Sequence, residues 1–319
     1  MRMLQRRSMV YRVPVALIGL LLAVSLICLS GCGGFSRSAG ESKQLYKGLD
    51  SPTGVYKKTM VLLPTSNDVQ WLPADLNSHF GPELRNAIQA KCNKIKVLTP
   101  EDPNFPARFS QSPSQAKGDL NGAELAAIGR ASGVNMVLSG RLVGIRHETE
   151  DQGMFWFAKV AHLARIQMEV AVYHAGTGAK LLDKTIFQDI DISVSEDAPI
   201  DVEGIKGTVA LSEALSDIAE TMGKDVCNVL GHIPWEGYVV SVEENRVVLS
   251  AGESSGLKKG KTLRVYTTNS TTGEGGIPAF TAPGKPTGSI TVTAVHADHS
   301  EAVLSDGGPI FKGNLVRAH

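Results

Sequence analysis

The chain has 319 residues, with 32 basic and 32 acidic side chains and a formal net charge of zero. Its hydrophobic content of 42% and charged content of 20% are typical of a globular protein. This balance gives no basic patch of the kind that marks a nucleic-acid-binding protein, so no nucleic-acid partner is expected.

The first 31 residues have the layout of an export signal. Four arginines precede an apolar run from Val13 to Leu29, and small residues then lead to a cysteine. This order predicts a signal peptide over residues 1–31 that is cleaved between Gly31 and Cys32. An uncleaved membrane anchor is the alternative, but the apolar run is short for a spanning helix, which needs about 20 residues.

The end of this segment resembles the lipobox of bacterial lipoproteins, with the sequence Leu29-Ser30-Gly31-Cys32. The resemblance implies that Cys32 receives the lipid and that its acyl chains, palmitate among them, anchor the mature protein. Gly33 follows the cysteine, where an aspartate would retain an enteric lipoprotein at the inner membrane. We therefore expect a lipid-anchored protein of the outer membrane that faces the periplasm.

Two cysteines remain after the signal and the lipid site are set aside. Cys28 lies in the signal, so Cys92 and Cys227 are left in an oxidising compartment that permits a disulfide. Such a bridge would close a long loop and stabilise the fold by roughly 4–5 kcal/mol in the chain-entropy model. Cys227, however, lies off the apolar stripe of its predicted helix, and two independent, partly buried thiols are the alternative.

Residues 32–56 are rich in Gly, Ser and Lys and predict a flexible tether. The following residues predict alternating strands and helices, with an irregular loop over 99–120 and a turn at His147–Gly153. Strands are expected at Met60–Pro64, Ile95–Leu98, Val134–Ile145, Phe155–Tyr173 and Lys180–Ile192, and helices at Pro82–Cys92, Asn121–Ala131 and Thr208–Leu230.

The last part of the chain changes character. From Glu236 onward, short strand-like runs and glycines predict a small barrel. Lys259-Gly260 and Lys312-Gly313 follow two similar segments, which predicts two equivalent turns. Residues 268–287 are rich in Gly, Thr and Pro and predict a loop.

The first folded part resembles the TolB N-terminal-like fold of three groups of proteins: the curli secretion lipoprotein, the activator lipoproteins of penicillin-binding proteins, and the middle domain of flagellar assembly protein T. The resemblance rests on Met60–Pro64, Ala126–Gly140 and Val170–Gly178. His174 and Ala175 replace the acidic turn residue that is usual in the last segment. The resemblance implies an α/β domain with a mixed sheet over residues 57–233.

The tail resembles the C-terminal domain of flagellar assembly protein T. Gly252–Gly260, between Val247–Leu249 and Leu263–Tyr266, carries this similarity. It implies a small SH3-like β-barrel over residues 234–319, so the expected fold class is α+β.

No catalytic constellation emerges from the sequence. Nucleophile motifs and phosphate-binding loops are missing from it, so neither an enzyme nor a cofactor is expected. His296, His299 and Glu301 could ligate a metal, but the strand-like runs on either side indicate a hairpin turn, and no metal site is predicted.

The best candidate for a partner-binding surface is the aromatic run Phe155, Trp156 and Phe157 beside a polar turn. Aromatic residues are favoured at binding hot spots. The alternative is that these residues cover the core of their own domain.

These observations predict a non-enzymatic periplasmic scaffold or assembly factor, held at the outer membrane by its lipid and similar to flagellar assembly protein T. Its expected partner is another envelope protein or a second copy of itself. A regulator of peptidoglycan synthases and a curli-type secretion component are the alternatives.

The lipid site can be tested directly. Cys32→Ala removes the thiol that would carry the lipid, so the variant should lose palmitate labelling and leave the membrane fraction. A variant that still sediments with membranes would contradict the prediction.

Overall fold

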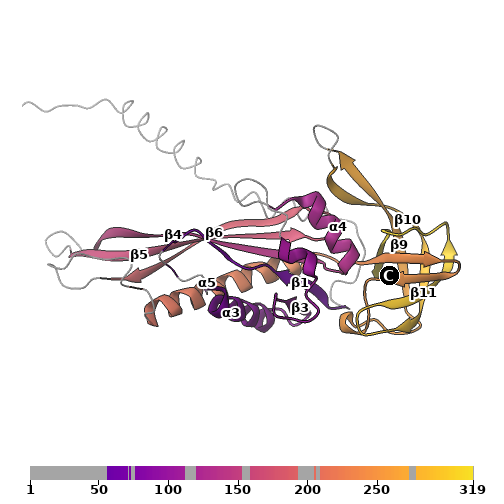
Figure 1. The fold of residues 1–319 in the computed structure, drawn as a ribbon, viewed down its shortest axis with the longest axis horizontal. Coiled ribbons are helices and arrows are strands. Elements are labelled where there is room, and N and C mark those ends of the chain that lie inside the picture. Colours follow the sequence, from indigo (N-terminus) through magenta and orange to yellow (C-terminus); the bar gives the residue numbers. More distant parts are fainter. Residues whose placement is uncertain are drawn as a thin grey trace, which may run out of the picture. The chain divides into compact units, whose positions relative to one another are not determined.

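The computed structural model describes residues 56–70, 72, 76–111, 120–152, 159–192, 205, 209–272 and 278–318. The chain divides into two units, Met1–Arg37 and Ser38–His319, and every described residue belongs to the second. That unit contains a mixed sheet with helices and a closed β-barrel, each with its own apolar core (Figure 1). The predicted combination of a mixed α/β part and a barrel is thereby confirmed.

The mixed sheet has the strand order β3-β1-β4-β5-β6, and the short β2 pairs with β4. β1 is parallel to β3 and β4, whereas β4, β5 and β6 form an antiparallel meander. The strands are β1 (Lys58–Leu62), β2 (Ser66–Asn67), β3 (Ile95–Leu98), β4 (Met136–Gln152), β5 (Lys159–His174) and β6 (Lys180–Asp191).

Two helices, α3 (Leu76–Lys91) and α5 (Val209–Leu230), pack against each other and contribute to the main core of the sheet (Figure 1). The alternation predicted for β5 is confirmed, because Ile166, Met168, Val170 and Val172 are buried in this core. The apolar stripe predicted for α5 is buried against the same face and consists of Leu211, Leu215, Ile218, Met222 and Val226.

A second apolar cluster forms on the opposite face of the sheet, where α4 (Gly122–Ser132) packs. Val61 of β1 and Val137 of β4 point into it, while their sequence neighbours point into the main core. The predicted ends of this helix are confirmed. The Asn121 side chain accepts two backbone N–H groups, and Gly133 ends the helix in the left-handed conformation.

The barrel closes in the order β10-β11-β8-β7-β12-β9. Its strands are β7 (Gly237–Glu243), β8 (Arg246–Leu249), β9 (Thr262–Thr272), β10 (Pro278–Val295), β11 (Ser300–Gly307) and β12 (Leu315–Ala318). The two Lys-Gly turns are equivalent, because Gly260 and Gly313 have φ values of 82° and 87°. Short 3-10 helices lie at Ala107–Gln111 and Glu253–Ser255.

Helix α3 begins earlier than predicted. We expected Pro82 in its first turn, but the helix starts at Leu76 and contains Pro82. Phe80 extends the buried spacing of Leu84 and Ile88 toward the N-terminus. Packing of this stripe outweighs the one backbone hydrogen bond that the proline cannot donate.

Two predicted irregular segments are strands instead. β4 runs to Gln152 through most of the predicted turn at His147–Gly153, because its polar residues pair across to β5 without an apolar face to reveal a strand. β9 and β10 likewise extend into the predicted loop 268–287. The prolines of β10 lie at irregularities in its register with β9.

The signal peptide and nearly all of the predicted tether lie outside the described residues. Tyr56, placed at the end of the tether, is 5% exposed and packs on Trp235 with ring centroids 4.8 Å apart. Across the described ranges, none of the helices combines the length and the apolar character needed to span a membrane.

Candidate functional site

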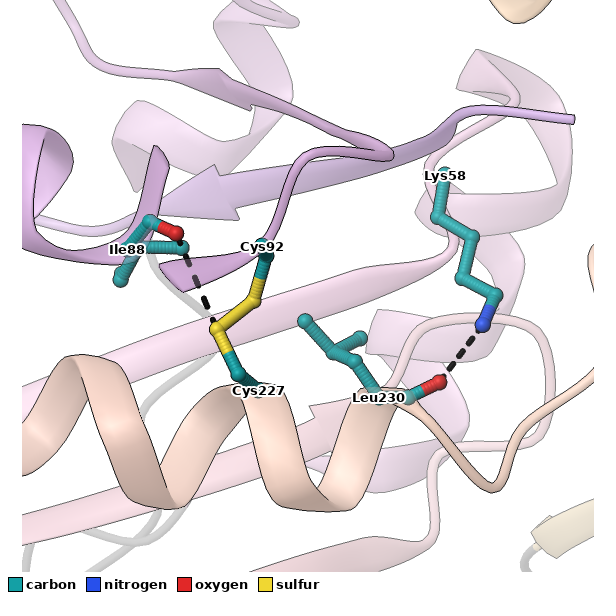
Figure 2. The surroundings of a disulfide bond; sticks show 5 residues. All are labelled: Lys58, Ile88, Cys92, Cys227 and Leu230. Atoms are coloured by element: carbon teal, nitrogen blue, oxygen red, sulfur yellow. Dashed lines mark hydrogen bonds between the residues drawn. A yellow bond between two sulfur atoms is a disulfide. The ribbon is translucent and has the colours of Figure 1, made fainter. Parts of the chain in front are cut away.

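A disulfide joins the two helices that cover the sheet. Cys92, directly after α3, is bonded to Cys227 in α5, with 5.6 Å between their Cα atoms (Figure 2). The Cys227 Sγ also lies 3.7 Å from the carbonyl oxygen of Ile88. Cys227 lies off the apolar stripe because it faces α3 rather than the sheet, which is why helical phase alone did not pair it with Cys92.

A cavity of about 220 Å³ lies beside this disulfide. It is lined by both cysteines and by Lys58, Lys91, Asn93, Lys94, Ile95, Leu230 and Gly231. The Lys58 Nζ donates a 2.6 Å hydrogen bond to the Leu230 carbonyl at the end of α5 (Figure 2). Burial lowers the pKa of the Lys58 ammonium to about 8, and the Glu236 carboxylate partly opposes that shift.

The lysines that line this cavity lie where positive charge is favourable. α3 and α5 both end at the cavity, so the negative ends of two helix dipoles meet there. Ammonium groups at that position stabilise the last carbonyls of the helices. The arrangement therefore supports the packing of the two helices.

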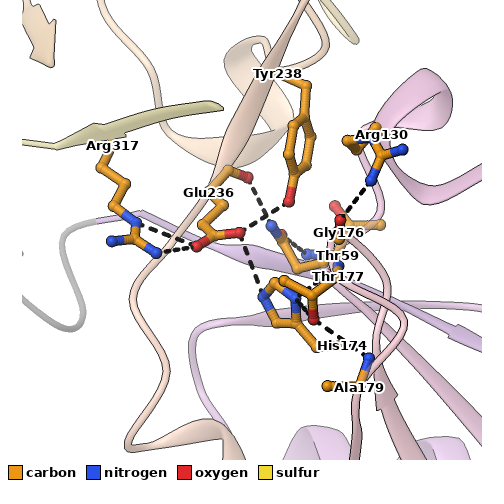
Figure 3. A network of polar contacts seen from close by, with 10 residues as sticks. Thr59, Arg130, His174, Gly176, Thr177, Ala179, Glu236, Tyr238 and Arg317 are labelled. Atoms are coloured by element: carbon orange, nitrogen blue, oxygen red, sulfur yellow. Dashed lines mark hydrogen bonds and ion pairs between the residues drawn. The ribbon is translucent and has the colours of Figure 1, made fainter. Parts of the chain in front are cut away.

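A buried polar network connects the sheet to the barrel around Glu236. Arg317 of β12 donates to the Glu236 Oε1 through Nε at 3.1 Å and also through Nη2 (Figure 3). The hydroxyl of Tyr238, in β7, donates to the Oε2 at 2.8 Å. We call this set, together with His174 and Asn135, the polar joint.

His174, at the end of β5, brings the sheet into the polar joint. Thr177 donates its backbone N–H to the His174 Nδ1 at 3.2 Å, and its hydroxyl lies 3.0 Å from the same nitrogen. The other ring nitrogen, Nε2, lies 3.3 Å from the Glu236 Oε2.

Asn135, which precedes β4, connects both parts through its amide. Its Nδ2 donates to the Glu236 carbonyl at 2.6 Å, and its Oδ1 accepts the Thr59 N–H at 2.9 Å. The side chain thus ties the first strand of the sheet to the residue that enters the barrel.

Burial of the polar joint is nearly complete. The side chains of Arg317, Glu236 and His174 are 0%, 1% and 1% exposed. Burial alone would raise the pKa of the Glu236 carboxyl, but His174 and Arg317 outweigh it and lower this pKa to about 2. A substrate cannot reach groups sealed in this way, so the polar joint acts as a structural connection.

The backbone at Gly176 packs closely against Tyr238 of the polar joint. Gly176 lies two residues after His174, and a side chain there would collide with the hydroxyl of Tyr238. Its carbonyl accepts a 2.8 Å hydrogen bond from the Arg130 Nη1 of α4. The hairpin turn between β5 and β6 is therefore pressed against both the barrel and α4.

Several predicted site residues lie outside the described residues. These are the lipid and cleavage residues Gly31 and Cys32 and the aromatic run Phe155, Trp156 and Phe157. The structure shows the strands that flank the aromatic run, since β4 ends at Gln152 and β5 begins at Lys159.

The predicted hairpin turn near His296 is confirmed between β10 and β11. The rings of His296 and His299 stack with centroids 4.3 Å apart, and His299 contacts the Asp298 carboxylate at 2.7 Å. Within the described ranges, no group of three or more His, Cys, Asp or Glu side chains could hold a metal ion.

Sequence reasoning missed the polar joint. One signal was present, since Arg317 stands inside the short apolar strand Leu315-Val316-Arg317-Ala318. A charged residue within a strand buried at every position requires a buried partner. Nothing in the sequence, however, identified that partner as Glu236, 81 residues away.

No protein-family model matches the chain. No curated protein matches it either.

Solved structures give only distant similarities. A hypothetical protein from Chlamydia trachomatis is 14% identical, with a TM-score of 0.34 and coverage of 55% of this chain and 97% of that one. A Neisseria meningitidis lipoprotein is 13% identical, with a TM-score of 0.28 and coverage of 54% and 99%. The PelC dodecamer from Paraburkholderia phytofirmans is 11% identical, with a TM-score of 0.27 and coverage of 53% and 92%. All three TM-scores are below 0.5.

The polar joint predicts an acid-sensitive fold. Glu236 has a pKa of about 2 in the folded chain and near 4.5 in the unfolded chain, so its stabilisation is complete above pH 4.5. It is lost as the pH falls toward 2, by about 3 kcal/mol in total. Denaturant unfolding between pH 5 and 2.5 should show the free energy of unfolding decreasing over this range.

A double variant provides the control for this pH dependence. Glu236→Gln with Arg317→Met removes both charges, which avoids leaving an uncompensated buried guanidinium. Its loss of stability on acidification should be smaller than that of the wild type by about 3 kcal/mol. Equal losses in the two proteins would contradict the assignment of this effect to Glu236.

Removal of the disulfide should lower the stability of the fold. The bridge spans 135 residues, so its removal should lower the free energy of unfolding by about 4–5 kcal/mol. Wild-type protein in dithiothreitol should match the variant carrying Cys92→Ser and Cys227→Ser, and that variant should not respond to the reductant. A wild type equally stable with and without reductant would show that the bridge does not form in solution.

Proposed function

We propose that this protein is a lipid-anchored protein of the bacterial cell envelope that acts as a scaffold or assembly factor and not as an enzyme. The observation that carries the proposal is the export signal ending in Leu29-Ser30-Gly31-Cys32. Gly33 after the cysteine favours the outer membrane, with the folded part in the periplasm.

The disulfide supports export of the protein independently of the signal sequence. Cys92 and Cys227 are bonded, and such bridges persist in oxidising compartments such as the periplasm. A reducing cytosol would open a bridge with half-buried sulfurs beside an open cavity.

The order of elements supports the assignment of both parts to families. Apart from the two-residue strand β2 and one 3-10 helix, the order β1-α3-β3-α4-β4-β5-β6-α5 agrees with the order expected for a TolB N-terminal-like domain, and a small closed barrel follows. On this basis we propose that the two parts are a TolB N-terminal-like domain and an SH3-like barrel, as in flagellar assembly protein T.

The polar joint fits a scaffold better than a catalyst. His174 and Asn135 of the sheet contact the carboxylate and the carbonyl of Glu236, whose carboxylate is held within the barrel by Arg317 and Tyr238. Separating the two parts would leave the buried side chains of His174 and Asn135 without these partners, which costs free energy. The two parts would therefore present their surfaces to a partner in a fixed arrangement.

The proposed partner surface is the connection between β4 and β5, which carries Phe155, Trp156 and Phe157. The flanking strands end in polar residues, and Arg165 pairs there with Asp189 at 2.7 Å and with Glu150 at 3.3 Å. Aromatic residues beside a charged rim are the usual composition of a protein-binding hot spot.

Crosslinking in intact cells tests this proposal. Wild-type protein should crosslink to a defined envelope protein, and replacing Phe155, Trp156 and Phe157 together by serine should abolish that crosslink. Phe187→Ser is the matched control, because Phe187 is a 56% exposed aromatic on β6. It should leave the crosslink unchanged.

The identity of the crosslinked protein separates the alternatives. A flagellar or other assembly component would support the scaffold, a peptidoglycan synthase would support the regulator, and membrane-embedded rings of this chain would support the secretion component. Crosslinks that persist in the triple serine variant would contradict the proposed surface, and the absence of any specific partner would contradict the scaffold.

A further inference from the structure

The cavity beside the disulfide is built from segments that are far apart in the sequence. The end of α3 and the start of β3 line it with residues 91–95, and the end of α5 lines it with Leu230 and Gly231. Lys58, the first residue of β1, contacts both segments. Its backbone N–H donates to the Lys94 carbonyl at 3.1 Å, and its Nζ donates to the Leu230 carbonyl (Figure 2).

Lys58 brings a buried ammonium group with spare donors to this cavity. The residue is only 8% exposed, and an ammonium group has three N–H donors. Within the described part of the chain, one acceptor contacts it, the Leu230 carbonyl at 2.6 Å. Burial of a charged group without hydrogen-bonding partners costs free energy. The remaining donors of Lys58 therefore favour an acceptor inside the cavity.

The charges around the cavity favour an anion. Lys91 and Lys94 line it together with Lys58, and none of the described lining residues is acidic. The Lys91 Nζ pairs with Glu220 at 2.7 Å, but that carboxylate is 66% exposed, and surface pairs of this kind are weak. The ends of α3 and α5 oppose an anion with about half an elementary charge each. Three ammonium groups exceed these helix ends and Glu220 together, so the cavity keeps a net positive charge.

The size and the apolar wall of the cavity limit which anion it can hold. Its volume of about 220 Å³ is below the range of about 300–1,000 Å³ that is typical of sites for drug-sized ligands. Ile95, Leu230 and the disulfide add apolar surface to the lining. A small anion that carries an organic substituent matches both properties.

Phosphate matches the three ammonium groups better than a carboxylate does. A phosphate monoester carries nearly two negative charges at neutral pH and three acceptor oxygens. Lysine is a common phosphate ligand, because its compact charge attracts these oxygens without requiring the planar geometry of arginine.

We propose that this cavity binds the phosphate group of a small phosphate ester through the ammonium groups of Lys58, Lys91 and Lys94. The substituent of the ester contacts Ile95 and Leu230. Two sources have this chemistry, the headgroup of a phospholipid and a soluble phosphate ester.

The phospholipid source rests on the proposed lipid anchor at Cys32. The segment between Cys32 and Lys58 spans at most about 90 Å when fully extended. An anchor would therefore keep the cavity close to a bilayer, whereas a soluble ester reaches the cavity with or without the anchor.

Calorimetric titration with sn-glycerol 3-phosphate tests the site in the full-length protein. The protein is solubilised in a maltoside detergent, which contains no phosphate. The wild type should bind this ester and should not bind glycerol. Lys94→Gln should weaken binding about tenfold, because it removes one charged contact and leaves Lys58 and Lys91 in place.

Lys96→Gln is the matched control for this variant. Lys96 lies in β3, two residues after Lys94, and is not one of the residues that line the cavity. The control removes the same charge and should bind the ester as the wild type does. Equal weakening in both variants would overturn the proposed site, because it would show a general attraction to positive charge.

Lys58→Met tests the buried ammonium group. Methionine keeps most of the apolar stem of lysine and removes the charge, so the variant should lose binding of the ester. Retention of the Cys92–Cys227 bridge on non-reducing gels confirms that the variant is folded. A folded variant that binds as tightly as the wild type would overturn the role of Lys58. If the variant does not fold, the comparison of Lys94→Gln with Lys96→Gln decides.

Nanodiscs separate the two sources of phosphate. The full-length lipoprotein is placed in nanodiscs of phosphatidylglycerol, and in nanodiscs of a neutral galactolipid that contains oleate to match the surface charge. A headgroup in the cavity should weaken binding of the added ester at least fivefold in phosphatidylglycerol alone. Equal affinities in both nanodiscs would assign the site to a soluble ester.

The failure of this site and the failure of the proposed function have different signatures. A lipidated protein that binds no ester in detergent and responds equally to both nanodiscs would overturn the site and leave the anchor intact. A protein that carries no lipid at Cys32 but binds the ester would contradict the proposed anchor and leave the site intact.

Discussion

The ion pair between Glu236 and Arg317 lies within the barrel and forms the centre of the contact between the barrel and the sheet. Both groups are sealed from water, and either one alone would be an uncompensated buried charge. His174 and Asn135 bring the sheet to the same carboxylate and backbone carbonyl. The barrel and the sheet thus share one polar network, and separating them would leave the buried side chains of His174 and Asn135 without their barrel partners.

The disulfide adds a covalent constraint between the two helices that pack on the sheet. It joins α3 to α5 near the ends of both helices, where Lys58 also caps the final carbonyl of α5. The burial of Lys58 brings it within electrostatic reach of Glu236, so the helix ends and the polar joint are coupled. Helices, sheet and barrel are therefore held together by the disulfide and by buried polar contacts.

Much of the fold followed from periodicity. The stripe of α5, the alternation in β5 and the caps at Asn121 and Gly133 were predicted correctly, because each depends on residues within a few positions of one another. The errors have a common cause. The far end of β4 and the ribbon of β9 and β10 have no apolar alternation, so polar or proline-rich composition concealed strands whose stability comes from pairing. Helix α3 was shortened because a local rule about Pro82 was given more weight than the packing of Phe80.

By itself, the sequence predicted an export signal and a lipid site at Cys32 and determined the apolar faces of the helices and strands, because these are properties of consecutive or regularly spaced residues. Only the tertiary structure decided which cysteine faces which and which residue neutralises Arg317. The members of these sets are 135 residues apart in the disulfide and 81 residues apart in the ion pair. Contacts over such separations depend on how the helices and strands pack in three dimensions, which no local pattern encodes.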